Sequence, residues 1–552
     1  MTTAALIPMV RHRPAGWSCR SLRDAVLYAL AFFLISQLGG AMEQAQWMNS
    51  NDRERAQVMR QRAVDWRNGA IVYQILVDRF APSTKLEKKR GLYKSPRRLR
   101  NWQDLPTRGT YNRDAAVWSQ EIDFWGGDLD SLMSKLDYLQ ELGVEVVYLN
   151  PIFLSLTNHK YDAWDYHQVD PMYGTRKDVG RLAKALHERG MKLMLDGVFN
   201  HMGRQSPMFQ EALRDEKSRY REFFLFTPRS RYGYIGWNDV ENLPELNLDS
   251  QTVRDYLYAK PDSVVQSYLR QEKIDGWRLD VAFDLGFTYL SELTEAAHAA
   301  KPGCSIIGEI WNYPEEWRPA VDAVMNMHGR RLILGLVQGK LSGPLATEQW
   351  QTLCEDAGID HLLQAWLVLD NHDVPRLAHV LPQFWQQKMA RVLQFTLPGS
   401  VNLYYGSEVG MEGGDDPEQR APMRWDLITP DNQTYQLHKA LLRIRKQEPA
   451  LRYGDYRRLA SEKLFTFSRR TASIREAIFV IANPTARAVT EILSLREGKI
   501  MSNTPLRDLL SDRVFNSFTG TVEVTVPAHD VLILKPDCTP FPQGYSRYDR
   551  VY

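Results

Sequence analysis

Two acidic residues follow strand-like runs in surroundings that predict opposite protonation states. Arg278 and Asp280 are two positions apart in the run Gly276-Trp277-Arg278-Leu279-Asp280, so their side chains point to the same side of a strand. A guanidinium beside a carboxylate favours its ionised form, and we expect a lowered pKa and a nucleophilic carboxylate at Asp280. Glu309 lies between an apolar run and Trp311. An apolar pocket raises a carboxyl pKa, so Glu309 is expected to be protonated and to act as a general acid.

An Arg-x-Asp pair alone is more typical of a structural ion pair, so the prediction depends on what lies around it. Two carboxyls with opposed pKa environments across one cleft are what cleavage of a glycosidic bond requires. Asp373 adds a third acid, and His201 and His372 are donors suited to sugar hydroxyls, although each histidine alone is more typical of a core position. Flat aromatic rings suit sugar faces, and several follow predicted strands: Tyr161, Trp164, Trp125, Trp311 and Trp425.

The elements that carry these residues alternate between short apolar runs and segments with helical spacing, such as 128–142 and 176–189. Alternation of this kind predicts an α/β fold with a parallel sheet. The eight runs are 70–77, 144–149, 191–199, 274–281, 305–310, 321–325, 364–369 and 401–405. Polar residues follow them, namely Asp78, Arg79, Asn150, Asn200, His201, Asp280, Glu309, Asn326, His372, Asp373 and Glu408. This pattern predicts a (β/α)8 TIM barrel with one catalytic face at the carboxyl ends of its strands.

Further segments complete the predicted organisation. An aromatic, turn-rich stretch at about 203–262 indicates a subdomain inserted after the third strand, within a catalytic barrel spanning 70–452. Alternating segments in 453–536 predict a C-terminal antiparallel β-sandwich. A lead-in covers 42–69, and a Pro- and Tyr-rich tail covers 537–552.

The amino terminus predicts export. Four arginines precede the apolar run 25–35, and small residues follow at 39–41, which is typical of a signal peptide over residues 1–41. The alternative is an uncleaved membrane anchor, although the run is shorter than the roughly 20 residues that span a bilayer. We therefore expect a periplasmic or secreted protein.

The balance of charged residues argues against nucleic acid as a partner. The 552 residues include 69 Lys plus Arg against 67 Asp plus Glu. This near balance lacks the basic excess of proteins that bind nucleic acids.

With these residues in place, the chain resembles the α-amylase superfamily of retaining glycoside hydrolases, in its neopullulanase and cyclomaltodextrinase branch. The resemblance rests on four segments in the family's order: 196–201 (DGVFNH), 276–282 (GWRLDVA), 308–311 (GEIW) and 370–373 (DNHD). The branch is indicated by LPELN at 243–247, NHKYD at 158–162, and Asp415-Asp416-Pro417 leading to Arg420.

The resemblance implies a role for each matching residue. Asp280 is the nucleophile, Glu309 the general acid and base, and Asp373 a stabiliser of the transition state. Tyr161 stacks on the sugar, and the same subsite is lined by Asp196, His201, Arg278 and His372. The implied substrate is an α-glucan, and the implied activity is hydrolysis of α-1,4-glucosidic bonds in maltodextrins, cyclodextrins or starch. Two alternatives remain open: a 4-α-glucanotransferase with the same triad, and a non-catalytic, membrane-anchored barrel partner, which the three retained carboxylates disfavour.

Three departures from the family pattern change the details. Phe283 and Asp284 replace the Lys-His pair that many α-amylases carry after the nucleophile, so contacts to the leaving sugars differ. The branch's calcium-binding loop after the first strand is replaced by Ala81-Pro82-Ser83-Thr84, so we expect no required cofactor and no metal site, with Ca²⁺ the open alternative. The short lead-in leaves no room for the branch's N-terminal β-domain, which predicts a monomer.

Overall fold

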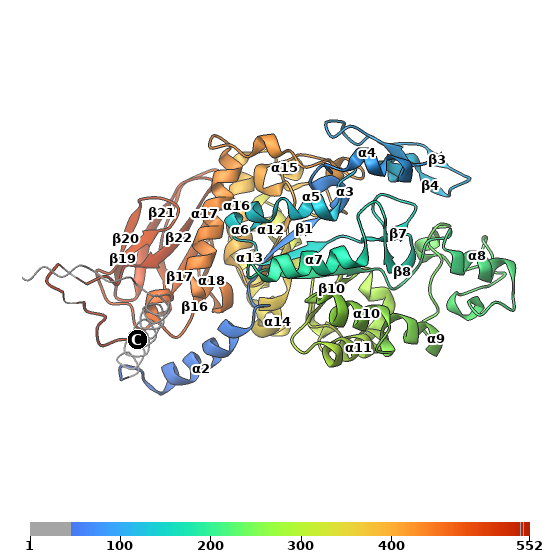
Figure 1. The fold of residues 1–552 in the computed structure, drawn as a ribbon. Coiled ribbons are helices and arrows are strands. Elements are labelled where there is room, and N and C mark those ends of the chain that lie inside the picture. Colours follow the sequence, from blue (N-terminus) through green and yellow to red (C-terminus); the bar gives the residue numbers. More distant parts are fainter. Residues whose placement is uncertain (1–45, 541, 545) are drawn as a thin grey trace, which may run out of the picture. The chain divides into compact units, whose positions relative to one another are not determined.

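The computed structural model describes residues 46–540, 542–544 and 546–552 (Figure 1). The predicted signal peptide lies outside these residues. Of the described residues, 46–54 and those from 539 onward belong to one unit, and 55–538 form another that contains every predicted site residue. Within the described ranges, no helix combines the length and apolar character needed to cross a lipid bilayer.

The larger unit contains the predicted barrel of parallel strands. All eight predicted strands form, and neighbours pair in the order β12-β11-β10-β9-β6-β1-β14-β13. A parallel bridge between Met325 and Trp366 joins the two ends of that order and closes the barrel. The strands are β1 (Ile71–Ile75), β6 (Val146–Leu149), β9 (Lys192–Gly197), β10 (Gly276–Leu279), β11 (Ser305–Gly308), β12 (Ala323–Val324), β13 (Trp366–Val368) and β14 (Ser400–Tyr404).

Side-chain alternation along these strands separates two layers of the core. Val72, Tyr148 and Met194 belong to a cluster inside the barrel, while Ile71 and Tyr73, one position away from Val72, belong to the larger cluster that includes the helices. Strands that are covered on both faces are apolar along their whole length. Each therefore appears in the sequence as a continuous apolar run, without alternation of apolar and polar residues.

Helices surround the barrel and connect its strands (Figure 1). The predicted helix 128–142 is wrong as one element, because it breaks at Ser134 and Lys135 into α5 and α6. The helices of this unit are α2 (Ser50–Val64, which begins in the other unit), α3 (Val77–Phe80), α4 (Leu86–Lys89), α5 (Leu129–Met133), α6 (Leu136–Leu142), α7 (Arg176–His187), α8 (Pro207–Arg214), α9 (Gln251–Arg254), α10 (Val264–Ser267), α11 (Ala282–Ala300), α12 (Met327–Val337), α13 (Gly343–Asp356), α14 (Ile359–Gln364), α15 (Leu377–Val380), α16 (Phe384–Thr396), α17 (Gln433–Gln447) and α18 (Pro449–Tyr453).

Long loops after the first three strands build the rim of the barrel. The predicted insertion after the third strand is present and holds α8 and α9, with the Phe209 ring packed against Phe224 and Tyr234 at centroid distances of 4.9 and 4.7 Å. The small strand pairs before it were not predicted: β2 (Arg98–Leu99) with β5 (Asp123–Phe124), β3 (Tyr111–Asn112) with β4 (Val117–Trp118), and β7 (Phe153–Ser155) with β8 (Ala163–Val169).

The C-terminal strands form the predicted antiparallel β structure. The eight strands pair in one order, β15-β16-β17-β22-β19-β20-β21-β18, and the sheet curls so that β21 lies against β17. It packs on barrel helices, with β16 against α13 and β22 against α16. The strands are β15 (Asp455–Arg458), β16 (Phe465–Arg470), β17 (Ile478–Asn483), β18 (Val489–Ser494), β19 (Pro505–Asp508), β20 (Val514–Phe518), β21 (Thr521–Val526) and β22 (Asp530–Pro536).

Candidate active site

A cavity of about 610 Å³ opens at the carboxyl ends of the barrel strands. Its walls include five of the predicted site residues, which are Asp280, Glu309, Asp373, Tyr161 and His201. The other three, Asp196, Arg278 and His372, are buried and contact four of these five, namely Tyr161, Asp280, Glu309 and Asp373. The structure therefore brings all eight predicted residues to one place.

Arg278 holds three carboxylates together. β10 and β9 pair in register with Arg278 opposite Asp196, and Arg278 Nη1 lies 2.8 Å from Asp196 Oδ1. The same nitrogen lies 3.0 Å from Asp280 Oδ1, and Nη2 lies 2.9 Å from Glu309 Oε2. Asp280 and Glu309 thus contact neighbouring nitrogens of one planar group. Their mutual position is fixed by a side chain that is itself fully buried.

The sharing of one guanidinium changes the expected protonation. Burial raises the pKa of Asp280 well above its ordinary value; Arg278 opposes this, and the charges of Glu309 and Asp196 reinforce it. The predicted lowering of this pKa is therefore wrong in direction, because a single cation is divided among three acids. Burial likewise raises the pKa of Asp196. Like charges this close disfavour the ionisation of all three acids together.

Glu309 is oriented by two further donors. Trp311 Nε1 donates to Glu309 Oε1 at 3.1 Å, and the backbone N–H of Val281 donates to Oε2 at 3.0 Å. Val281 has a φ of 38°, a left-handed conformation that a β-branched residue rarely adopts. Strain of this kind concentrates at functional sites, and here it occurs at the residue that follows Asp280 and donates to Glu309.

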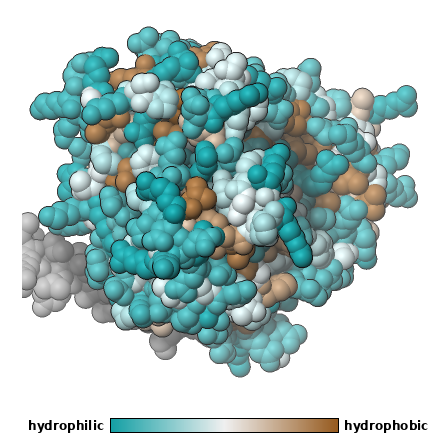
Figure 2. Space-filling view, turned by 90° about the vertical axis from the view of Figure 1, so that its right-hand side faces the viewer, coloured by the Kyte–Doolittle hydropathy of each residue, from teal (hydrophilic) through white to brown (hydrophobic). Residues whose placement is uncertain are grey.

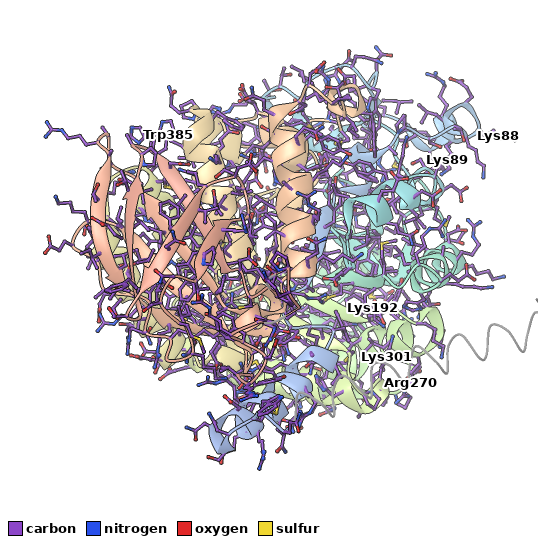
Figure 3. All side chains as sticks on the ribbon, turned by 90° about the vertical axis from the view of Figure 1, so that its left-hand side faces the viewer. Lys88, Lys89, Lys192, Arg270, Lys301 and Trp385 are labelled. Carbon is purple, nitrogen blue, oxygen red and sulfur yellow. The ribbon has the colours of Figure 1, made fainter. Side chains whose placement is uncertain are left out.

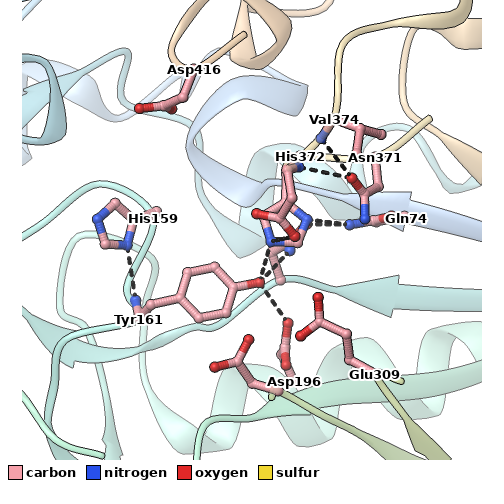
Figure 4. A network of polar contacts seen from close by, with 12 residues as sticks. Gln74, His159, Tyr161, Asp196, Glu309, Asn371, His372, Val374 and Asp416 are labelled. Carbon is pink, nitrogen blue, oxygen red and sulfur yellow. Dashed lines mark hydrogen bonds and ion pairs between the residues drawn. The ribbon is translucent and has the colours of Figure 1, made fainter. Parts of the chain in front are cut away.

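Asp373 is held between a histidine and an arginine. Asp373 Oδ2 lies 3.2 Å from His372 Nε2, and Asp373 Oδ1 lies 3.5 Å from Arg420 Nη2. Asn371 Oδ1 accepts from the backbone N–H of Asp373 at 2.8 Å, which fixes the turn (Figure 4). Arg420 is in turn paired with Asp416 at 3.0 Å.

A hydrogen-bond network fixes the ring of His372 (Figure 4). Gln74 Nε2 donates to His372 Nδ1 at 2.9 Å, while Asn402 Nδ2 donates to Gln74 Oε1 at 3.2 Å. His372 Nδ1 is therefore an acceptor, and the proton of the neutral ring lies on Nε2, toward Tyr161 and Asp373. Burial lowers the pKa of His372 well below its ordinary value. The Tyr161 ring stacks on this histidine at 5.3 Å, and its hydroxyl lies 2.9 Å from Asp196 Oδ2.

His201 lies in the cavity wall and is almost fully buried. Its ring stacks on Trp237 at 5.5 Å, and its Nε2 has no hydrogen-bond partner within the protein. Burial lowers its pKa to about 3, so the ring is neutral. A neutral, unpartnered imidazole nitrogen in a cavity wall is suited to a ligand hydroxyl.

Several predicted rim residues do not reach the cavity. Trp125 is buried beneath Arg79, 3.9 Å from its ring centroid, and Trp425 packs on Phe80. Of the polar strand ends, Asp78 accepts from Trp125 and Gly126 backbone N–H groups, Glu408 accepts from Tyr73 and Tyr138, and Asn326 caps α12. Short helical turns begin just after β1 and β14. These turns direct Asp78 and Glu408 away from the barrel axis.

Other wall residues were missed as site residues. Glu121, His159, Trp237, Asp416 and Arg420 all line the cavity. His159, Asp416 and Arg420 lie within segments that indicated the family branch, so a signal existed for them. Glu121 and Trp237 lie in loops of no recognised pattern, and only the fold places them.

The buried acid beside the loop after the first strand is paired with a lysine. The carboxylate of Asp128, fully buried, receives Lys89 Nζ at 2.6 Å and Ser83 Oγ at 2.5 Å. An ammonium thus already neutralises the buried acid beside this loop. Among the described residues, no group of three or more histidine, cysteine or acidic side chains is arranged to hold a metal.

Comparison with known proteins agrees with this geometry. Residues 74–454 match the family model described as "Alpha amylase, catalytic domain". A cyclomaltodextrinase from Geobacillus thermopakistaniensis is 35% identical over 72% of this chain and 66% of its own. Neopullulanase 2 from Thermoactinomyces vulgaris is 29% identical over 85% of this chain and 78% of its own.

Solved structures agree as well. The ligand-free cyclic α-maltosyl-(1→6)-maltose hydrolase from Arthrobacter globiformis has a TM-score of 0.70 at 25% identity, covering 85% of this chain and 99% of that one. The chain spans between 66% and 78% of the length of the two relatives named above. The barrel gathers three acids around Arg278, and the family model matches most of the chain. The chain therefore belongs to the α-amylase family of glycoside hydrolases.

Proposed function

We propose that the protein hydrolyses α-1,4-glucosidic bonds of maltodextrins, cyclodextrins or starch with retention of anomeric configuration. The observation that carries this proposal is the placement of Asp280 and Glu309 on neighbouring nitrogens of Arg278. Two carboxyls this near one another, one attacking and one donating a proton, are the arrangement of double displacement.

In the first step, Asp280 attacks the anomeric carbon while Glu309 gives its proton to the departing glycosidic oxygen. The bond to the leaving sugar breaks, and a covalent glycosyl ester forms on Asp280. In the second step, Glu309 takes a proton from water, whose oxygen bonds to the anomeric carbon and releases Asp280. The mechanism requires a protonated Glu309 and an ionised Asp280, and Arg278 Nη1, 3.0 Å from Asp280 Oδ1, favours the ionised form of Asp280.

Asp373 and its neighbours act on the sugar that becomes distorted. Asp373, held by His372 and Arg420, is exposed enough to accept from ring hydroxyls. Tyr161 offers a ring face, and His201 Nε2 an unpartnered atom. The sugar ring flattens in the transition state. Interactions that become stronger at that point lower the activation free energy, and do not only lower the dissociation constant of the substrate.

The experiment uses the chain without residues 1–41 and maltoheptaose as substrate. Wild type is expected to release reducing sugar, and Asp280→Asn and Glu309→Gln to lower kcat by at least about 10³-fold. Asp426→Asn, an exposed acid paired with Arg424, is the matched control and should retain full activity. An inactive wild type would instead favour the non-catalytic partner.

The preferred substrate, the oligomeric state and the export of the protein are part of the same proposal. The relatives' names point to cyclomaltodextrin and pullulan, and parallel digests of amylose, β-cyclodextrin and pullulan rank these substrates against a linear glucan. A 4-α-glucanotransferase would convert maltotriose into longer chains instead of releasing reducing ends. We further propose a monomeric protein exported through residues 1–41, which sedimentation and N-terminal sequencing of the exported product test.

A further inference from the structure

Three amide side chains lie inside the barrel, where branched apolar residues are usual. Gln74 on β1 is two positions after Val72, and Asn402 on β14 is paired with Val72, so both point into the barrel as Val72 does. Asn150 directly follows β6. Gln74, Asn402 and Asn150 are 0%, 1% and 1% exposed. On the outer face shown in Figure 2, hydrophilic residues predominate and water can satisfy them. Inside the barrel, an amide is costly unless protein groups bond it.

The three amides form one chain of hydrogen bonds that reaches the active site. Asn402 Nδ2 donates to Gln74 Oε1 at 3.2 Å. Gln74 Nε2 donates to His372 Nδ1 at 2.9 Å (Figure 4) and to Asn150 Oδ1 at 3.1 Å. Asn150 Nδ2 donates in turn to the Tyr161 hydroxyl at 3.0 Å. Reversing one amide would bring two donors or two acceptors together, so the amides can reverse only as a group.

Asp196 sets the direction of this chain. Its Oδ1 lies 2.8 Å from Arg278 Nη1, and its Oδ2 lies 2.9 Å from the Tyr161 hydroxyl. A carboxylate paired with a guanidinium can only accept, so Tyr161 gives its single proton to Asp196. The Tyr161 oxygen therefore accepts from Asn150 and from His372 Nε2, which contacts it. Both ends of the chain thus require the same form of His372, with the proton on Nε2.

The charge around His372 leaves its tautomer as the variable that matters. The charged or titratable groups around the ring are Asp373, Tyr161, Arg420, Arg278, Glu309 and His159. Burial lowers the pKa of His372 well below its ordinary value; the two arginines lower it further, and Glu309 opposes them. The ring is therefore neutral, and the uncharged Gln74 on Nδ1 selects which nitrogen donates.

We propose that Gln74 is a positioning residue of the active site, whose amide keeps the proton of His372 on Nε2. Through Asn150, the same amide directs the Tyr161 hydroxyl toward Asp196. The direction matters because Nε2 lies 3.2 Å from Asp373 Oδ2. A proton on Nε2 attracts this carboxylate, whereas the reversed chain would put a lone pair against it. The effect on catalysis rests on the proposed function, but the tautomer does not.

The first test is the tautomer of His372 in the free protein, measured by NMR after ¹⁵N labelling of histidine. His372→Asn assigns the signal by its loss. Wild type should carry the proton on Nε2 from about pH 5 to about pH 8. Gln74→Glu should place a proton on Nδ1 and raise the pKa of His372 by at least about one unit, because a carboxylate accepts where the amide donates. Gln394→Met removes another buried amide, which contacts the β14 backbone. This matched control should keep the wild-type tautomer.

The second test is activity on maltoheptaose. Gln74→Met is close to the native size but has no donor, so His372 loses its support on Nδ1. We expect kcat to fall about tenfold and KM to change less than about threefold, while Gln394→Met keeps both. A proton on Nδ1 in wild type, or a tautomer and pKa that Gln74→Glu leaves unchanged, overturns the role of Gln74. If Gln74→Glu does not fold, an unchanged kcat in Gln74→Met does so. An inactive wild type with the expected tautomer overturns the proposed function alone.

Discussion

Arg278 and Asp196 occupy opposed positions on β10 and β9, and their side chains meet at 2.8 Å in the fully buried centre of the site. Because the same guanidinium also reaches Asp280 and Glu309, its planar fork, and not its charge alone, sets the geometry.

Arg278→Lys is therefore expected to be severe despite the retained charge. A lysine offers one nitrogen in place of the two that contact Asp280 and Glu309, so kcat on maltoheptaose should fall at least about 100-fold. The uncompensated buried acids should also lower the free energy of unfolding by about 3 kcal/mol. Kinetics and urea unfolding measure the two effects. Arg181→Lys, on an exposed arginine, should change neither, and a fully active Arg278→Lys variant contradicts the shared-cation account.

Lys89 and its neighbour Lys88 provide a matched pair on α4 (Figure 3). Lys89 neutralises the buried Asp128 at 2.6 Å, whereas Lys88 is exposed. We expect Lys89→Met to lower the melting temperature by several degrees and Lys88→Met to leave it unchanged, because only the first leaves a buried charge unpaired.

Removal of calcium is a second test of the ion pair between Lys89 and Asp128. With an ammonium beside Asp128, dialysis against EDTA should alter neither the melting temperature nor the activity of wild type. A large loss of either on chelation, restored by Ca²⁺, would show that the chain holds a calcium ion after all.

Phe283 lies in the cavity wall beside Val281 and is 53% exposed, with Trp317 5.6 Å away. An aromatic face on the leaving side retains an acceptor sugar and excludes water from the covalent intermediate. Phe283→Ala should lower the ratio of transfer products to hydrolysis products from maltotriose by about two- to fivefold, as chromatography of the products measures. Phe384→Ala, another exposed phenylalanine, is the control, and an unchanged ratio assigns acceptor binding to other residues.

The strands and the residues that meet at the cavity were largely predictable because their signals are local. A parallel strand is an uninterrupted apolar run, and the spacing of Arg278 and Asp280 fixes a shared face. The protonation of Asp280 was not predictable, since it depends on Asp196 and Glu309, which are distant in sequence. Trp125 and Glu408 were assigned to the rim by position, yet local turns bury them in packing and hydrogen bonds.

Loop residues were the least predictable part of the site. Glu121 is joined to His159 only because the hairpin before it folds over the second strand's loop. Arg98 and Arg100 likewise pair with Asp123 of β5. Contacts of this kind depend on tertiary structure, so no periodicity or residue spacing in the sequence indicates them.

His438 on α17 makes stability depend on pH. Its side chain is 1% exposed, Nδ1 donates to the Thr434 carbonyl oxygen at 3.0 Å, and burial lowers its pKa to about 3. The unfolded chain takes up this proton below pH of about 6.5, whereas the folded chain does not. Stability from this group is therefore fully present above pH of about 6.5 and is lost as the pH falls toward 3.

The expected slope is up to about 1.4 kcal/mol per pH unit for this histidine. His438→Gln removes the titration, so the free energy of unfolding of this variant should fall less steeply between pH 6 and pH 4 than that of wild type, even if the variant is less stable at pH 7. Urea unfolding at each pH measures the slopes. His379→Gln, at an exposed position, should follow wild type, and parallel curves for wild type and His438→Gln would mean that another group governs the acid limb.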